Sequence, residues 1–170
     1  MEISQQYLDK IKSIVGLQNY LDDEFSIAPY LQDWGKKYTG KSAIVCKPET
    51  TSTLSKLMEF CNEFGIGVVP QGGNTGLVGG GIPSDSGAEI VISLEKMNKI
   101  LDIDPDNFTM TLEAGCILFD VQEAAKNADR MFPLSLASEG SCQIGGNLST
   151  NAGGTAVLKY GNIKELVLGI

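Results

Sequence analysis

The sequence predicts a fold that mixes α-helices with β-strands, and three observations carry this prediction. Apolar residues recur at helical spacing over residues 3–15 and 54–64. Short runs rich in Val and Ile stand at 43–46, 66–69 and 90–92. The strand, helix and strand of residues 43–69 form a βαβ unit, whose crossover should be right-handed.

Length and charge limit the class of protein. The chain has 170 residues, which allows one well-buried domain or two subdomains that share a core. Its net charge of -8 argues against a broad surface for nucleic acid or anionic membranes. No apolar run approaches the roughly 20 residues that span a bilayer. The first residues also lack the basic start and apolar core of a secretory signal.

The cysteines and the missing histidines limit the chemistry. The four cysteines contain no CxxC pair, so we expect free thiols, no metal site and a cytoplasmic location. The chain has no histidine. This removes the commonest general base and excludes a Ser-His-Asp triad within these residues.

We expect three parts along the chain, and residues 1–40 are the first. Residues 3–15 should form an amphipathic helix that ends at Gly16, followed by an irregular lead-in. Lys36 and Lys37 could contact an anion, but a solvated turn is the better interpretation of this pair.

Residues 41–101 are the second part and contain the βαβ unit. Thr50 to Thr53 are N-cap candidates, and Gly65 closes the helix. One apolar face of this helix should consist of Leu54, Leu57, Met58, Cys61 and Phe64. The strand at 66–69 then leads into a glycine-rich loop, which should lie at the carboxyl end of a parallel strand, where α/β sheets bind ligands.

Residues 102–170 are the third part. We expect an acidic turn at 102–107, a strand at 109–113 and a helix at about 117–129. Residues 164–170 read as a strand that stops in mid-run, which suggests an incomplete fragment.

The first glycine-rich stretch, VVPQGGNTGLVGGGIP at 68–83, has six glycines between Gly72 and Gly81 and no charged side chain. Glycine permits positive φ and close approach, so this stretch could present backbone N–H groups to a phosphate or pyrophosphate. It has neither the lysine of a nucleoside-triphosphate loop nor the glycine spacing of a Rossmann fingerprint. A flexible hairpin loop is the alternative.

The second glycine-rich stretch spans residues 131–161. Its only charge between Met131 and Leu158 is Glu139, and six glycines lie between Gly140 and Gly161. Small polar side chains accompany these glycines and could meet a ligand edge-on. The two stretches together could therefore line an extended ligand, whereas a tightly packed loop is the alternative for the second.

The motifs PQGGNTGLVGG, PLSLASEGSCQIGGNLSTNAGG and KYGNIKELVLG resemble the FAD-linked oxidases of the vanillyl-alcohol oxidase and p-cresol methylhydroxylase type. Within them, the chain is most similar to the FAD-dependent D-2-hydroxyacid dehydrogenases, a group that includes D-lactate and D-2-hydroxyglutarate dehydrogenases and a glycolate oxidase subunit. The resemblance covers roughly residues 30 to 170. It implies an α+β FAD-binding domain of two subdomains, with the cofactor between them.

The resemblance also implies the cofactor-binding residues. Those expected around the FAD pyrophosphate are Pro70, Gln71, Gly72, Gly73, Asn74, Thr75, Gly76 and Leu77. Those expected near the flavin, ribityl chain or ribose are Ser141, Ile144, Gly145, Gly146, Asn147, Thr150, Asn151, Gly153, Gly154, Tyr160 and Gly161. Ser135, Ala137 and Ser138 depart from the family's motif, which is more acidic and glycine-rich there.

The function implied by the resemblance is oxidation of a D-2-hydroxy acid to the 2-oxo acid, with the electrons passed to an acceptor. Family members are much longer, and no catalytic residue is expected within this chain. Because histidine is absent, FAD should be held non-covalently. Two alternatives are an FAD-dependent alcohol or carbohydrate oxidase of the same superfamily and a stand-alone, non-catalytic nucleotide-binding module.

Overall fold

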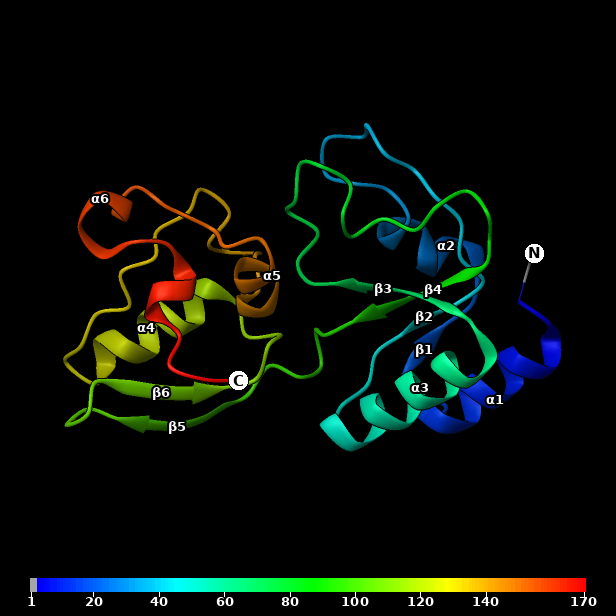
Figure 1. Ribbon diagram of the computed structural model, residues 1–170, viewed down its shortest axis with the longest axis horizontal. Coiled ribbons are helices and arrows are strands. Elements are labelled where there is room, and N and C mark those ends of the chain that lie inside the picture. The colour runs from blue at the N-terminus through cyan, green and yellow to red at the C-terminus, as the bar shows by residue number, and fades with distance from the viewer. Residues whose placement is uncertain (1–2) are drawn as a thin grey trace. The chain divides into compact units, whose positions relative to one another are not determined.

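The computed structural model describes residues 3–170 and contains two compact units, Met1–Lys96 and Met97–Ile170 (Figure 1). Both combine helices with strands, so the predicted α+β class is confirmed. The lead-in at 1–40 falls within the first unit. The division of the chain into three parts, after residues 40 and 101, stays a prediction. None of the helices described between residues 3 and 170 is long and apolar enough to cross a membrane.

The first unit is built on a four-stranded sheet. Its strands are β1 (Tyr20–Leu21), β2 (Val45–Cys46), β3 (Gly67–Gln71) and β4 (Glu89–Ser93), in the spatial order β1-β2-β4-β3. Both β2 and β3 run parallel to β4, and β1 is antiparallel to β2. Since β3 and β4 are parallel, the chain that leaves the carboxyl end of β3 must return to the other end of the sheet before β4 begins. The first glycine-rich stretch starts this return.

Both faces of this sheet are covered, because side chains alternate along a strand. Ile90 and Ile92 pack with α1 (Gln5–Val15) and α3 (Thr51–Phe64), whereas Val91 packs with Ile27 on the opposite side. Ile27 ends α2 (Glu24–Ile27), which continues as the 3-10 helix η1 (Ala28–Tyr30). Figure 1 shows α1 and α3 together on one side of the sheet and α2 on the other.

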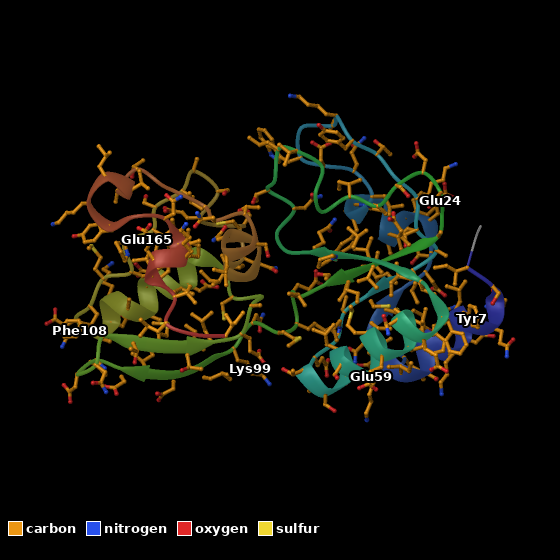
Figure 2. All side chains as sticks on the ribbon, viewed as in Figure 1. Tyr7, Glu24, Glu59, Lys99, Phe108 and Glu165 are labelled. Carbon is orange, nitrogen blue, oxygen red and sulfur yellow. The ribbon has the colours of Figure 1, made fainter. Side chains whose placement is uncertain are left out.

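The predicted C-caps Gly16 and Gly65 and the N-cap of α3 are confirmed, whereas α1 begins at Gln5 and not at residue 3. The Thr50 side chain accepts a hydrogen bond from the Thr53 N–H, and Gly65 ends α3 at φ 64°. On the predicted apolar face, Leu57 and Cys61 are buried, whereas Met58 and Phe64 are 43% and 41% exposed. Phe64 lies at the end of the helix, where its ring centroid is 4.9 Å from that of Tyr7 in α1. Tyr7 is labelled on α1 in Figure 2.

The second unit pairs a β-hairpin with short helices. Strands β5 (Ile100–Asp104) and β6 (Thr109–Leu112) are antiparallel. The helical segments are α4 (Leu118–Asn127), α5 (Ile144–Ser149), α6 (Val157–Tyr160) and the 3-10 helix η2 (Ile163–Leu166). Leu118 and Val121 of α4 pack in one cluster with Ile144 and Ile163, and β5 and β6 contribute half-buried side chains to it.

Several sequence-based assignments were wrong or missed. The helical segments α2 and η1 lie in the lead-in that was expected to be irregular. Residues 164–170 form no strand: η2 occupies the first of them, Ile163 is fully buried and Ile170 is exposed. Our acidic turn began too early, because Asp102–Asp104 belong to β5, where they pair with β6. The two-residue β1 was missed, because it is a strand only through its pairing with β2.

Candidate functional site

The first glycine-rich stretch leaves β3 at Gln71 as a loop of free backbone donors. Within the part of the chain that the structure describes, none of the ten N–H groups from Gly72 to Gly81 donates a hydrogen bond. Residues 72–75 are half-buried and Gly76 to Val78 are exposed. Backbone N–H groups that are left without a protein partner need water or a ligand as acceptor. This loop is therefore able to accept an anion.

The Gln71 side chain does not face outward from this loop. It is only 3% exposed, and its Nε2 donates to the carbonyl oxygens of Gly81, at 2.7 Å, and Tyr30, at 2.9 Å. The side-chain amide therefore closes the base of the loop. Among the residues expected around a pyrophosphate, Gln71 has its side chain occupied by its own chain.

Positive φ occurs at Asn74 (52°) and Gly79 (76°) of this loop. The Asn74 side chain donates from Nδ2 to the Gln32 carbonyl oxygen at 2.8 Å. At Gly79, a Cβ atom would lie 2.9 Å from the Tyr38 ring. Gly76, by contrast, has open space within 4 Å of the Cβ position. Any steric need for glycine at Gly76 must therefore come from something that the protein binds.

A charged cluster lies behind the base of the loop. Glu95 accepts hydrogen bonds from Tyr30 (2.9 Å) and from Ser93 (3.1 Å), and its carboxylate lies 2.8 Å from Lys47 Nζ. Burial by itself raises the pKa of Glu95, but the hydrogen bonds from Lys47 and Tyr30 outweigh it and hold the pKa below its usual value. The lysine charge is thus neutralised within the unit, and the N–H groups of the loop remain the donors available to an anion.

In the second glycine-rich stretch, several expected cofactor residues are used to pack the chain. A Cβ on Gly154 would overlap with the Ser135 carbonyl oxygen. A Cβ on Gly145 would lie 2.9 Å from the Ala114 side chain, and the Gly145 N–H donates to the Ala114 carbonyl oxygen at 2.7 Å.

Gly153 and Gly161 show the same close packing. At Gly153 a Cβ would lie 2.7 Å from Asn162 Oδ1, and Gly161 has a φ of 75° beside Glu165. The packed-loop interpretation therefore explains Gly145, Gly154 and Gly161 without a ligand, whereas the atom nearest to Gly153 is the end of the flexible Asn162 side chain.

The remaining expected residues divide by exposure. Ser141 and Thr150 are exposed, Tyr160 is half-buried, and Asn147 is buried. Gly146 has open space around its Cβ position, as Gly76 does in the first loop. Ile144 is buried in the core of its unit. Asn151 adopts a φ of 49°, and its Oδ1 accepts from the Lys164 N–H at 3.3 Å.

One further residue was missed by our sequence analysis. Gln143 is 7% exposed, and its Oε1 is the one buried side-chain oxygen or nitrogen in residues 3–170 without a hydrogen-bond partner. A buried carbonyl oxygen without a donor is costly, so it indicates a place for a ligand N–H or O–H, or for water. Its polar type and its position next to Ile144 were the only sequence signals.

Residues 3–170 contain no gathered group of three or more Cys, Asp or Glu side chains that could hold a metal. All four cysteines are free and buried. Burial raises the pKa of Cys46 to about 12 and that of Cys61 to about 11. The Cys46 and Cys61 thiols are therefore protonated at neutral pH and are poor nucleophiles.

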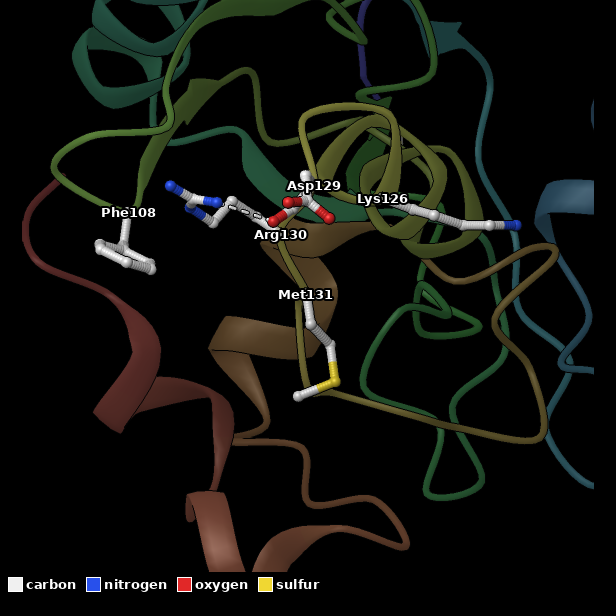
Figure 3. A pocket seen from close by; sticks show the side chains of 5 residues that line it. All are labelled: Phe108, Lys126, Asp129, Arg130 and Met131. Carbon is white, nitrogen blue, oxygen red and sulfur yellow. Dashed lines mark hydrogen bonds between the residues drawn. The ribbon is translucent and has the colours of Figure 1, made fainter.

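A hollow of about 530 Å³ lies elsewhere in the second unit (Figure 3). It is lined by Phe108, Lys126, Asp129, Arg130 and Met131, none of which belongs to the expected cofactor residues. The hollow is wide open, and Phe108 and Met131 are 76% and 63% exposed. Arg130 already donates to the carbonyl oxygens of Pro105 and Asp129. We therefore base the candidate site on the glycine-rich stretches and not on this hollow.

The two stretches fit the parts of a dinucleotide cofactor such as FAD. Free N–H groups at the first loop can hold a pyrophosphate without a lysine, as nests of backbone donors do. The second stretch offers open glycine, hydroxyl and amide groups with few charges, which suits a neutral ring system. The unpartnered Gln143 oxygen adds an acceptor there.

Comparison with known proteins agrees with this fit. Residues 42–170 match the FAD binding domain family. A probable mitochondrial D-2-hydroxyglutarate dehydrogenase of Oryza sativa subsp. indica is 43% identical over 159 residues, which are 94% of this chain and 28% of that protein. A D-2-hydroxyglutarate–pyruvate transhydrogenase of Saccharomyces cerevisiae is 45% identical over 144 residues, covering 85% of this chain and 29% of that protein. The chain thus spans less than a third of the length of these relatives.

Solved structures show the same fold at lower identity. An alkyldihydroxyacetonephosphate synthase superposes with a TM-score of 0.87 at 17% identity, over 96% of this chain and 32% of that one. A 6-hydroxy-D-nicotine oxidase from Arthrobacter nicotinovorans gives 0.73 at 17% identity, over 89% and 32%. The predicted resemblance to the vanillyl-alcohol oxidase and p-cresol methylhydroxylase type is confirmed in the fold. The chain belongs to the FAD binding domain family, whose model its residues 42–170 match.

Proposed function

We propose that the first glycine loop holds the pyrophosphate of FAD on the backbone N–H groups of Gly72 to Leu77, with Pro70 and Gln71 at its base. The supporting observation is the run of N–H groups without acceptors from Gly72 to Gly81, in a stretch without charged side chains. A dianion on neutral donors avoids the desolvation of a buried lysine. The attachment is non-covalent in this proposal, because the chain has no histidine.

The second stretch is assigned to the remaining parts of the cofactor. Ser141, Gly146, Asn147, Thr150 and Tyr160 are the groups whose exposure or open space suits direct contact. Gly145, Gly154 and Gly161 hold these groups in place through the backbone, and Gly153 lies beside the Asn162 side chain. When bound, FAD supplies the two-electron oxidising chemistry that the side chains of this chain lack.

For the whole protein, we propose oxidation of a D-2-hydroxy acid to the 2-oxo acid. The support is the identity of 43–45% to proteins named for D-2-hydroxyglutarate and of 39% to a putative D-lactate dehydrogenase of Schizosaccharomyces pombe. In this proposal, the groups that bind substrate, move its proton and meet the electron acceptor lie outside these 170 residues. The full protein should reduce an acceptor dye with D-2-hydroxyglutarate or D-lactate, and inactivity with both would contradict the substrate class.

A cytoplasmic location also remains a proposal. The four free thiols fit a reducing compartment. The rice and fission yeast relatives carry the word mitochondrial in their names. Fractionation of cells that express the full protein decides between the two compartments.

The binding proposal is tested by titrating FAD into the chain while following flavin fluorescence, with Gly76→Val and Gly169→Val as a matched pair. Both glycines have open space around the Cβ position, so neither change should lower the melting temperature. If FAD approaches Gly76, Gly76→Val should weaken binding by at least about tenfold, which corresponds to about 1.4 kcal/mol. Equal affinity in the wild type and both variants, or no binding by the wild type, would overturn the assignment.

A further inference from the structure

We propose that the segment Pro29–Tyr38 braces the first glycine loop and is thereby a positioning element of the cofactor site. This bracing segment lies outside residues 42–170, which match the FAD-binding family. Our sequence analysis placed it in an irregular lead-in. The inference rests on the proposed function only for the identity of the ligand, because the contacts between the two segments stand without it.

The bracing segment has a shape of its own, and Asp33 sets it. The Asp33 side chain is 3% exposed and accepts from the N–H groups of Gly35 (3.1 Å), Lys37 (2.7 Å) and Tyr38 (2.7 Å). The Asp33 N–H in turn donates to the Tyr38 carbonyl oxygen at 3.1 Å. This network closes a tight turn with Lys36 at a φ of 55°. The segment is therefore a firm support in spite of its lack of regular structure.

Side-chain amides tie the loop to this support at two points. Gln71 Nε2 donates to the Tyr30 carbonyl oxygen at 2.9 Å and to that of Gly81 at 2.7 Å. Asn74 Nδ2 donates to the Gln32 carbonyl oxygen at 2.8 Å. Figure 1 shows the two segments, blue to cyan and green, running beside each other in the first unit.

The third contact is steric. Gly79 lies so close to the Tyr38 ring that a Cβ would come within 2.9–3.1 Å of three of its carbon atoms. Gly79 also has a φ of 76°, which only glycine adopts easily. The far side of the loop is thus held against the bracing segment by close backbone contact.

This arrangement explains how the loop can be ordered while its N–H groups stay free. A loop held by its own backbone would use N–H groups as donors to carbonyl oxygens. Here the donors are the amides of Gln71 and Asn74, and the acceptors are carbonyl oxygens of the bracing segment. Residues 72–81 keep their N–H groups for a ligand. Ordering the loop before binding lowers the entropy lost when the ligand arrives.

The test uses two changes in the loop and one in the bracing segment. Gln71→Leu removes both amide hydrogen bonds at similar volume. Asn74→Gly removes the side-chain hydrogen bonds to the carbonyl oxygens of Gln32 (2.8 Å) and Pro29 (3.4 Å) and keeps positive φ available. Asp33→Ala loosens the bracing segment and touches no residue of the loop. The last change separates bracing from direct ligand contact. If Gln71 and Asn74 acted only by touching the ligand, a change at Asp33 would not affect binding.

Two controls match these changes. Ser42→Ala removes a buried side-chain donor to the carbonyl oxygens of Ile44 and Glu89, near the amino end of β4. Asp129→Gly replaces another polar residue at positive φ (56°), in the second unit.

The first measurement needs no cofactor: ¹⁵N relaxation order parameters of the amides from Gly72 to Gly81 in the free chain. We expect values near about 0.85 in the wild type and controls, and below about 0.6 in the three test variants. The second is binding of inorganic pyrophosphate, which we expect the same three changes to weaken by about tenfold or more. Asp33→Ala should also keep the amide spectrum of the second unit.

Unchanged order parameters and unchanged pyrophosphate affinity in Asp33→Ala would overturn the brace, even if Gln71→Leu binds weakly. If Asp33→Ala fails to fold, Tyr38→Ala replaces it with the same expected results. A wild type that binds neither pyrophosphate nor FAD but shows the expected loss of order would contradict the proposed function and leave the brace supported. Binding that is lost without any loss of loop order would assign Gln71 and Asn74 to ligand contact instead.

Discussion

Lys47 Nζ lies 2.8 Å from Glu95 Oε1, and the other carboxylate oxygen of Glu95 accepts a 2.9 Å hydrogen bond from the Tyr30 hydroxyl. The Lys47 side chain is 14% exposed and that of Glu95 is 39% exposed. One acidic group therefore links the residue that follows β2 with η1 and the end of β4, beside the glycine loop. The Tyr30 carbonyl oxygen accepts a hydrogen bond from Gln71. Tyr30 is therefore held by the charged cluster and in turn binds the base of the glycine loop.

Replacing Lys47 with Met should lower the free energy of unfolding at pH 7 by about 1 kcal/mol, because solvent screens a carboxylate that is more than a third exposed. The pKa of Glu95 is lowered, so its contribution is present above the unfolded pKa of about 4.3 and is lost as the pH falls through the folded pKa. Urea unfolding at pH 7 and pH 3 should show the difference shrink at pH 3. Hydrogen bonds to Glu95 and Tyr30 outweigh burial and raise the pKa of Lys47, so its contribution is lost only above about pH 10.4.

Lys126→Met is the control for this ion pair, because its partner Glu123 is one turn away on α4 and the lysine side chain is 74% exposed. Its effect should stay below about 0.5 kcal/mol. If Lys47→Met lowers the free energy of unfolding by the same amount at pH 7 and pH 3, the packing of the lysine side chain, and not its charge, stabilises the unit.

The four thiols should be inert in the folded chain. All are buried, and burial raises the pKa of Cys46 to about 12 and that of Cys61 to about 11. A disulfide-exchange dye at pH 8 should therefore react slowly with the native protein. After unfolding without reductant, the dye should react with four thiols per chain. Fast native reaction at any cysteine would contradict the packing described here, and fewer than four thiols after unfolding would contradict the free state.

Gly154 and Gly146 should respond to alanine in opposite ways. A Cβ at Gly154 overlaps with the Ser135 carbonyl oxygen, so Gly154→Ala should cost about 1–3 kcal/mol of stability in the absence of any ligand. Gly146 lies in α5 with open space around it, so Gly146→Ala should keep or slightly raise the melting temperature while it weakens FAD binding. Calorimetry and FAD titration of both variants check this, and a destabilised Gly146→Ala would remove Gly146 from the cofactor assignment.

Local signals in the sequence predicted much of the first unit. The caps of α3 at Thr50 and Gly65 and the strands on either side were visible because each depends on a few neighbouring residues. The strand predicted at 164–170 was wrong, because a strand also needs a partner strand and an apolar run does not show whether one exists. The strand Tyr20–Leu21 was missed for the opposite reason, since its sequence has no strand pattern and only its pairing with β2 makes it a strand.

For the site, the sequence predicted which stretches matter better than what each residue does. Gln71 looked like a ligand contact because it stands among glycines, but its amide is buried against carbonyl oxygens 10 and 41 residues away along the chain. Gly154 looked available and is required by packing. The support from Pro29–Tyr38 was invisible, because it runs through backbone carbonyl groups, which every residue carries.

The most direct test of the central claim is the change in ¹H–¹⁵N amide shifts when FAD is added to the chain. We expect the largest changes in the first unit to fall on Gly72 to Leu77, whose N–H groups are free, and to recur with inorganic pyrophosphate alone. In the second unit, changes should gather at Ser141 to Thr150. No change from Gly72 to Leu77 on saturation with FAD, or changes confined to the hollow around Phe108 and Arg130, would contradict it.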